Sequence, residues 1–128
     1  MDLKDLTPKE FTVDVPIVHP VSGEPLVNDD GSEMTITMYA PYSKEYKAVL
    51  HSQTNKRLKN RDKEITAEGI EESTLELLAQ TTKSWNITFD GEQPKCTASK
   101  AKDIYTEVFW IRNQLEAGVD KTLDFMNT

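Results

Sequence analysis

The feature that most constrains the fold is a pair of β-type segments near the N-terminus, separated by turn-forming residues. FTVDVPIVHP (11–20) and EMTITMYA (33–40) are rich in β-branched residues and alternate between apolar and polar side chains, which is typical of strands. The residues between them include Ser-Gly, Asp-Gly and proline, which favour turns. We therefore expect a long β-hairpin, which must pack on an apolar surface because two strands alone are marginally stable in water. Pro16 lacks a backbone N–H, so its strand is expected at a sheet edge or to contain a bulge.

Three helices are expected to supply that apolar surface. Ser43 and Thr66 are residue types that cap helix N-termini, and the first helix is predicted to run from Ser43 to about Arg61. The third begins after Thr97, and Gly118 weakens its last part, so residues 119–126 are expected to form a separate turn. The positions that recur at helical spacing are Tyr46, Val49 and Leu50 in the first helix, Ile70, Thr74, Leu77, Leu78, Thr81 and Trp85 in the second, and Ala101, Ile104, Tyr105, Val108, Leu115 and Val119 in the third.

The order of these segments predicts an α+β fold in a single domain that covers residues 1–128. A chain of this length can sustain one hydrophobic core. The β-hairpin is expected in residues 1–42 and a three-helix region in residues 43–128. A short extended segment, NITF (86–89), is expected before the last helix, followed by a turn at DGEQP (90–94).

A reactive loop is one interpretation of WNITFDGEQPKCT (85–97), which brings acidic residues close to Cys96, the single cysteine. A nucleophilic cysteine needs a nearby base, but His19 and His51 are predicted in the hairpin and in the first helix. A zinc site built from these three residues would lack a fourth ligand. We therefore interpret Cys96 as a small, partly buried side chain.

No other motif in the sequence points to chemistry. A calcium loop at LVNDDGSEMTIT (26–37) would have Leu26 in place of its first carboxylate and Thr37 in place of its glutamate. The sequence contains no phosphate-binding loop, dinucleotide fingerprint or nucleophile elbow. We expect no catalytic residue, no metal and no cofactor, and hence a function that depends on contact with other molecules.

The global features are those of a cytosolic protein. No apolar run approaches the ~20 residues that span a bilayer, and MDLKDLTPKEF (1–11) lacks the apolar stretch of a signal peptide. A single cysteine cannot form an internal disulfide. We expect a cytosolic location and no membrane partner.

Charge is distributed unevenly along the chain. The net charge of -7 argues against nucleic-acid binding, which needs a positive surface. In KRLKNRDK (56–63), however, five of eight residues are Lys or Arg, and an acidic stretch (64–76) follows. Two interpretations remain open: solvated helix faces with ion pairs, or a contact surface for an acidic partner or a neighbouring subunit. The second predicts four contact residues, Lys56, Arg57, Lys59 and Arg61.

Trp110 is the second predicted contact site. At ~100° per residue, it falls on the third predicted helix opposite the apolar face, near Glu107 and Gln114, and Phe109 extends the same patch. Tryptophan is enriched at binding hot spots and is unfavourable in water. The alternative is that the hairpin covers this second face and buries Trp110, since a hairpin needs an apolar support.

The order of segments resembles the tail assembly chaperones of long-tailed bacteriophages. The resemblance covers FTVDVPI, TITMYAPYSKEYKAVL, a polar middle and WNITFDGEQPKCTASKAKDIYTEVFWIRNQLEAGVDKTLDF. It is strongest in the final third, where an extended segment leads to a helix and the matching residues are Trp85, Gly91, Pro94, Tyr105, Trp110, Ile111, Gln114 and Phe125.

The resemblance implies a non-enzymatic assembly factor in the cytoplasm of the infected bacterium. Such a protein binds the tape measure protein and tail tube subunits, associates with itself and is absent from the mature virion. A programmed frameshift commonly adds a C-terminal extension in this family. Two alternatives remain: a tail-completion or head–tail joining protein retained in the virion, and an acidic adaptor that inhibits a host protein by charge mimicry.

Overall fold

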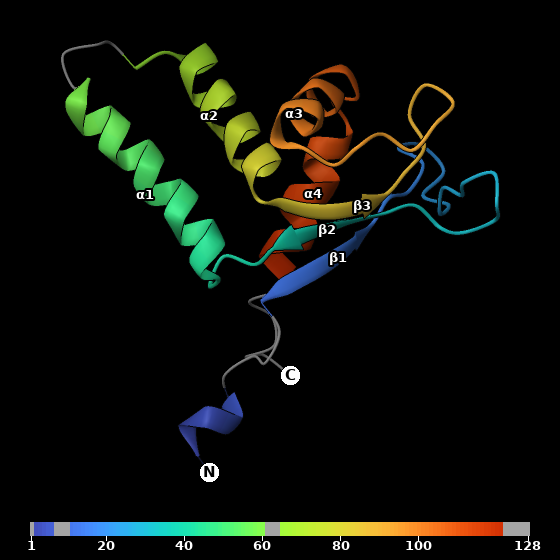
Figure 1. The fold of residues 1–128 in the computed structure, drawn as a ribbon, viewed down its shortest axis with the longest axis horizontal. Helices are drawn as coiled ribbons and strands as arrows, with labels where there is room; N and C mark the ends of the chain where they lie inside the picture. Colours follow the sequence, from blue (N-terminus) through green and yellow to red (C-terminus); the bar gives the residue numbers. More distant parts are fainter. Residues whose placement is uncertain (1, 7–10, 61–64, 122–128) are drawn as a thin grey trace.

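The computed structural model describes residues 2–6, 11–60 and 65–121 (Figure 1). In these residues a β-hairpin, β1–β2, is followed by helices and a third strand, which confirms the predicted α+β class. The elements, in chain order, are the 3-10 helix η1 (Leu3–Leu6), β1 (Thr12–Pro16), β2 (Thr35–Tyr39), α1 (Lys44–Lys59), α2 (Ala67–Gln80), β3 (Thr82–Asn86), α3 (Ala98–Glu107) and α4 (Ile111–Asp120).

The three strands form one antiparallel sheet in the order β1-β2-β3. Val15 pairs with Ile36 and Ile36 pairs with Trp85, so these apolar side chains lie in one row across the sheet. Pro16 is in β1, an edge strand, as predicted. The extended segment expected at NITF (86–89) overlaps β3 only at Asn86, because the strand lies earlier, at Thr82–Asn86. This strand joins the hairpin from within the helical part of the chain.

The core lies between one face of this sheet and the helices. Helix α4 packs on β1 and β2, and α3 packs on α2 (Figure 1). The opposite face of the sheet is polar, and on it Thr37 Oγ1 donates a hydrogen bond of 2.6 Å to the exposed Asp14. Antiparallel sheets commonly have one buried and one solvated face. The buried core side chains are Val15, Ile17, Ile36, Met38, Leu75, Leu78, Ala79, Trp85, Ile87, Ala101, Ile104, Tyr105, Ile111, Leu115 and Val119.

The second helix is shorter than predicted. It ends at Gln80, and Thr81 and Trp85 lie outside it. Thr81 Oγ1 donates a hydrogen bond of 2.6 Å to Leu77 O at the helix end, where a threonine side chain can compete with helical bonding. The prediction was wrong because Trp85 fits both a helical and a strand pattern, and pairing with β2 decides between them.

The predicted third helix is two helices in the structure, so the described residues contain four α-helices rather than three. Val108 leaves the helical conformation with ψ of 69°, and the chain turns before α4 begins. The break occurs at consecutive β-branched and aromatic residues, VFWI (108–111), which have low helix propensity. It allows α3 to pack on α2 while α4 packs on β1, which one straight helix does not permit.

Gly118 does not end the last helix, because α4 continues through it to Asp120. The expected turn at 119–126 is therefore wrong for its described part, and residues 122–126 lie outside the described residues. A Cβ atom at position 118 would lie 2.7 Å from Val15 Cγ2, closer than packed atoms approach. The glycine allows α4 to lie directly against β1.

Replacing Gly118 with alanine should destabilise the protein despite the higher helix propensity of alanine. The propensity favours Gly118→Ala by about 1 kcal/mol, whereas overpacking costs about 1–3 kcal/mol, and Val15 is buried with little room to move. We expect a lower free energy of unfolding in urea denaturation. In a Val15→Ala background the same change should become neutral or stabilising. A similar loss in both backgrounds would contradict a steric origin.

Candidate partner-binding groove

Helix α1 is fixed at its first turn and exposed along the rest of its length. Ser43 is buried and caps the helix, its Oγ accepting a hydrogen bond of 3.1 Å from Tyr46 N. The structure describes all 16 residues of α1, and none of them is buried. Leu58 is 64% exposed. Because most helical stability in proteins comes from packing, α1 receives unusually little support from its own chain.

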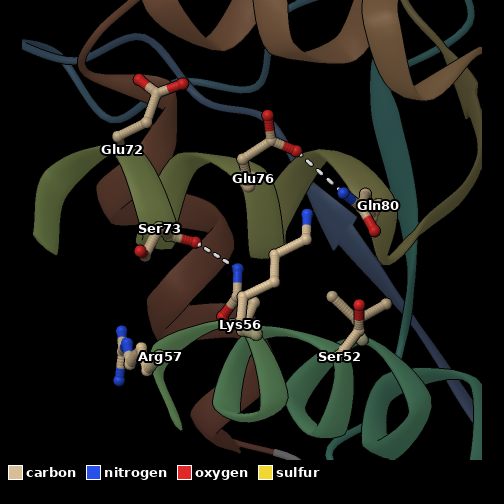
Figure 2. A pocket seen from close by; sticks show the side chains of 9 residues that line it. Ser52, Lys56, Arg57, Glu72, Ser73, Glu76 and Gln80 are labelled. Atoms are coloured by element: carbon tan, nitrogen blue, oxygen red, sulfur yellow. Dashed lines mark hydrogen bonds between the residues drawn. The ribbon is translucent and has the colours of Figure 1, made fainter. Parts of the chain in front are cut away.

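A groove of about 240 Å³ separates α1 from α2 (Figure 2). Gln53 Nε2 donates a hydrogen bond of 2.8 Å to Ser73 O, which ties the two helices together across it. Most of its lining residues are polar, and Val49 is the apolar side chain among them. Its lining residues are Val49, Ser52, Gln53, Lys56 and Arg57 from α1, and Glu72, Ser73, Glu76 and Gln80 from α2.

The carboxylates of α2 are bound by cations from other helices. Lys102 Nζ, on α3, forms ion pairs with Glu72 and Glu76, and lies 2.7 Å from Glu76 Oε1. This contact and a hydrogen bond from Gln80 lower the pKa of Glu76, while the hydrogen bonds to Glu72 and Glu76 raise the pKa of Lys102. Glu71, which directly precedes Glu72 on α2, forms an ion pair of 3.0 Å with Arg112 of α4.

In the described part of the chain no carboxylate forms an ion pair with Lys56 or Arg57, but Lys56 is close enough to Glu76 to help lower the pKa of that carboxyl. Figure 2 shows the Lys56 side chain extending from α1 towards α2. Both residues lie in the last turn of α1, where positive charge interacts favourably with the helix dipole. Their position stabilises α1 and also gives one wall of the groove a positive charge.

A second hollow, of about 230 Å³, lies between α1, α2 and α4. Tyr46 lies at its α1 side, and burial, with the nearby Asp120 and Glu116, raises the pKa of its hydroxyl. The first turns of α1 therefore rest on an apolar surface, whereas the later turns face the polar groove. The other lining residues are Thr74, Leu77, Leu78 and Val119.

The structure brings two of the four predicted basic contact residues, Lys56 and Arg57, into the groove. Lys59 is exposed in the last turn of α1, and Arg61 lies outside the described residues. The acidic residues expected to meet this basic run across subunits lie on α2 of the same chain. Contact across subunits stays a prediction.

The other predicted contact residues do not form one helix face. Trp110 is partly buried against the core in the turn between α3 and α4, so its predicted place on the polar face of a continuous helix is wrong. The Gln114 side chain forms two hydrogen bonds of 2.9 Å with the backbone of Val18. Glu107 is exposed, and so is Phe109, at 67%. Helix α3 lies on the far side of α2 from α1 (Figure 1), whereas the end of α4 borders the second hollow together with α1.

Cys96 is partly buried, as predicted, and burial raises the pKa of its thiol. His19 Nδ1 accepts hydrogen bonds from Val21 N and Ser22 N, at 3.1 and 3.2 Å, and thereby stabilises the hairpin turn. His51 is exposed on α1. Within residues 2–6, 11–60 and 65–121, no group of three or more His, Cys, Asp or Glu side chains has the arrangement of a metal site.

Comparisons with known proteins give no further guide to the site. No family model, no curated protein and no solved structure matches this chain. Among the described helices, none has both the length and the apolar character needed to cross a membrane. The geometry of the groove and the resemblance in sequence therefore carry the functional argument.

Truncating Trp110 should lower stability, whereas truncating its neighbour Phe109 should not. Trp110→Ala removes a side chain packed against the core, at an expected cost of about 1–3 kcal/mol, below the value for a fully buried tryptophan. Phe109→Ala changes an exposed side chain and should stay within ~0.5 kcal/mol. Urea denaturation of both variants measures this. Equal stability of the two would contradict the core role of Trp110.

Helix α1 should open more readily than the rest of the fold. Because it buries none of its residues, its amide hydrogens should exchange at least roughly tenfold faster, relative to intrinsic rates, than those of Ala101 to Tyr105. Native-state hydrogen exchange followed by NMR compares the two segments in one sample. Equal protection would mean that α1 unfolds only with the whole protein.

Proposed function

We propose that this protein is a non-enzymatic chaperone of bacteriophage tail assembly. It binds the tape measure protein and tail tube subunits in the cytoplasm of the infected bacterium, forms homo-oligomers, and is absent from the mature virion. The sequence resemblance in the strand pair and the final third of the chain is one support for this proposal. The arrangement of α1 and α2 is the other.

The observation that carries the proposal is the exposure of α1. A helix of 16 residues with none buried has most of its contact surface available for another protein. Helix α2, in contrast, has Leu75, Leu78 and Ala79 buried in the core. A partner that enters the groove would meet one fixed wall and one wall that gains packing on binding. Such a surface suits a protein that acts by temporary contact.

The apolar residues exposed on other elements provide a second surface for association. Phe109 lies between α3 and α4 and is 67% exposed, and Ile70 on α2 is 53% exposed. Single exposed apolar residues are common on protein surfaces, so the proposal of a homo-oligomer rests mainly on the resemblance. Light scattering over a range of concentrations tests it, and a monomer at high concentration in low salt would contradict it.

Co-expression with the tape measure protein and the tail tube protein tests the main proposal. We expect this chain to co-purify with the tape measure protein and to increase its yield in the soluble fraction. Mass spectrometry of purified virions should then detect the tube protein but not this chain. Its presence in virions at a fixed copy number would indicate a structural tail or head–tail joining protein. A lack of binding to both partners would overturn the proposal.

A further inference from the structure

We propose that α1 packs roughly antiparallel against α1 of a second copy of this chain, and that the basic end of each helix lies at the hollow between α1, α2 and α4 of the other copy. The inference rests on the proposed function for the occurrence of self-association, and it adds the surface that is used. It follows from an apolar ridge along α1, from the lining of the hollow and from the match between the two.

The first step concerns the apolar ridge on α1, which consists of Tyr46, Leu50, Thr54 and Leu58. Its members recur every four residues and therefore lie on one side of the helix. Tyr46 packs against the core, whereas Leu50 and Leu58 are exposed. The ridge is roughly 18 Å long, and ridges of this spacing pack together in the commonest mode of contact between helices. Most of it lies uncovered in the described part of the chain.

The second step concerns the hollow at the start of the ridge. Tyr46 lines it together with Leu77 and Val119. Its volume of about 230 Å³ is many times the ~10–15 Å³ that one water molecule needs. Ile70, exposed one turn before the lining residue Thr74 on α2, extends its apolar wall. The hollow can therefore admit an apolar side chain from another molecule.

The charged side chains in the lining of the hollow are acidic. Among the residues that the structure describes, they are Glu116 and Asp120, one turn apart on α4. Neither forms an ion pair in the described part of the chain. Lys47 and Lys121 adjoin the hollow in sequence, but they are exposed and do not line it. Because Asp120 ends α4, where the helix dipole disfavours negative charge, a cation from another molecule is favourable here.

The third step identifies a second copy of the chain as the occupant. Leu58 lies between Arg57 and Lys59 in the last turn of α1, so this end offers an apolar side chain flanked by two cations. An apolar hollow with an acidic rim fits that combination. In an antiparallel pair the Leu58 end of one helix meets the Tyr46 end of the other, and the two-fold axis repeats the contact. A parallel pair would bring the two basic ends together, where like charges repel.

Sedimentation equilibrium of the full chain measures the self-association. A contact along one helix is expected at or below the ~1,200 Å² of small stable interfaces, so the dimer should be weak, with a Kd on the order of 100 µM. Its Kd should increase with salt. NMR over the same concentrations should shift the signals of Leu50, Thr54 and Leu77 but not that of Phe109. A monomer up to about 1 mM, or shifts centred on Phe109, would overturn the inference.

Two matched substitutions test the ridge. Leu58 is 64% exposed and Phe109 is 67% exposed, so neither change should prevent folding. Leu58→Ala should weaken dimerisation by roughly tenfold, because the dimer buries this side chain twice. Phe109→Ala should leave the Kd nearly unchanged. Equal effects of the two substitutions would overturn the inference.

A charge exchange tests the contact between the basic end and the hollow. One variant carries Arg57→Glu with Lys59→Glu, and the other carries Glu116→Lys with Asp120→Lys. Each alone should dimerise roughly tenfold more weakly or not at all. A 1:1 mixture should recover the dimer, because each copy then offers the charge that the other lacks at both symmetric contacts. A mixture that associates no better than either variant alone would overturn the inference.

The control for net charge is Lys83→Glu with Lys95→Glu. It alters two exposed lysines outside the ridge and the hollow and changes the net charge by the same amount as the variant of the basic end. It should dimerise nearly as well as the unmodified chain. A loss equal to that of the Arg57→Glu, Lys59→Glu variant would overturn the inference. Circular dichroism checks that all variants fold.

Failure of the inference and failure of the proposed function give different results. If the chain forms dimers that the ridge variants leave unchanged, the inference fails and the proposed function stands. If the dimer depends on the ridge but neither the tape measure protein nor the tube protein binds, the proposed function fails and the inference stands. If the chain stays monomeric and the tape measure protein shifts the signals of the ridge, the ridge binds that partner and the inference is overturned.

Discussion

The hydrogen bond between the Tyr105 hydroxyl and Thr82 Oγ1, 2.7 Å long, joins α3 to the point where α2 ends and β3 begins. Thr82 Oγ1 also donates to Leu78 O at 2.8 Å, so one hydroxyl connects a strand with two helices. Burial raises the pKa of the Tyr105 hydroxyl above its usual value. The direction of α2, and with it one wall of the groove, depends on this buried junction.

The other wall has no comparable support. Helix α1 is held by the Ser43 cap, by the packing of Tyr46 against the core and by the hydrogen bond from Gln53 to Ser73, and most of its remaining surface lies in solvent. Binding to such a helix has a thermodynamic consequence, because a partner must offset the entropy lost when α1 becomes more ordered. Because α1 has little support from its own chain, it can adjust its position to partners of different width. A contact of this kind can be specific in charge and still be released when assembly advances.

Local patterns were sufficient to predict the elements whose determinants are close in sequence. The hairpin follows from alternation and turn residues, and the caps predicted at Ser43 and Thr66 are confirmed by hydrogen bonds to backbone N–H groups. The errors arose where contacts with residues distant in sequence determine the secondary structure. Trp85 lies in a strand because β2 offers an unpaired edge, and the turn at Trp110 exists because α3 and α4 pack on different partners. Neither partner is visible in a local pattern.

The same distinction applies to the groove. The basic run identified Lys56 and Arg57, because the charge of a short segment can be counted. The sequence could not show that Glu72 and Glu76 of α2 form ion pairs with Lys102, a residue of another helix, rather than with the basic run. Opposite charges adjacent in sequence suggest mutual neutralisation, but ion pairs depend on which side chains reach one another in space. The groove is therefore lined by charges of both signs, Lys56 and Arg57 from α1 and Glu72 and Glu76 from α2. The net charge of -7 does not describe this local balance, because it is a sum over the whole surface, whereas a partner interacts mainly with charges within about 10 Å of its own.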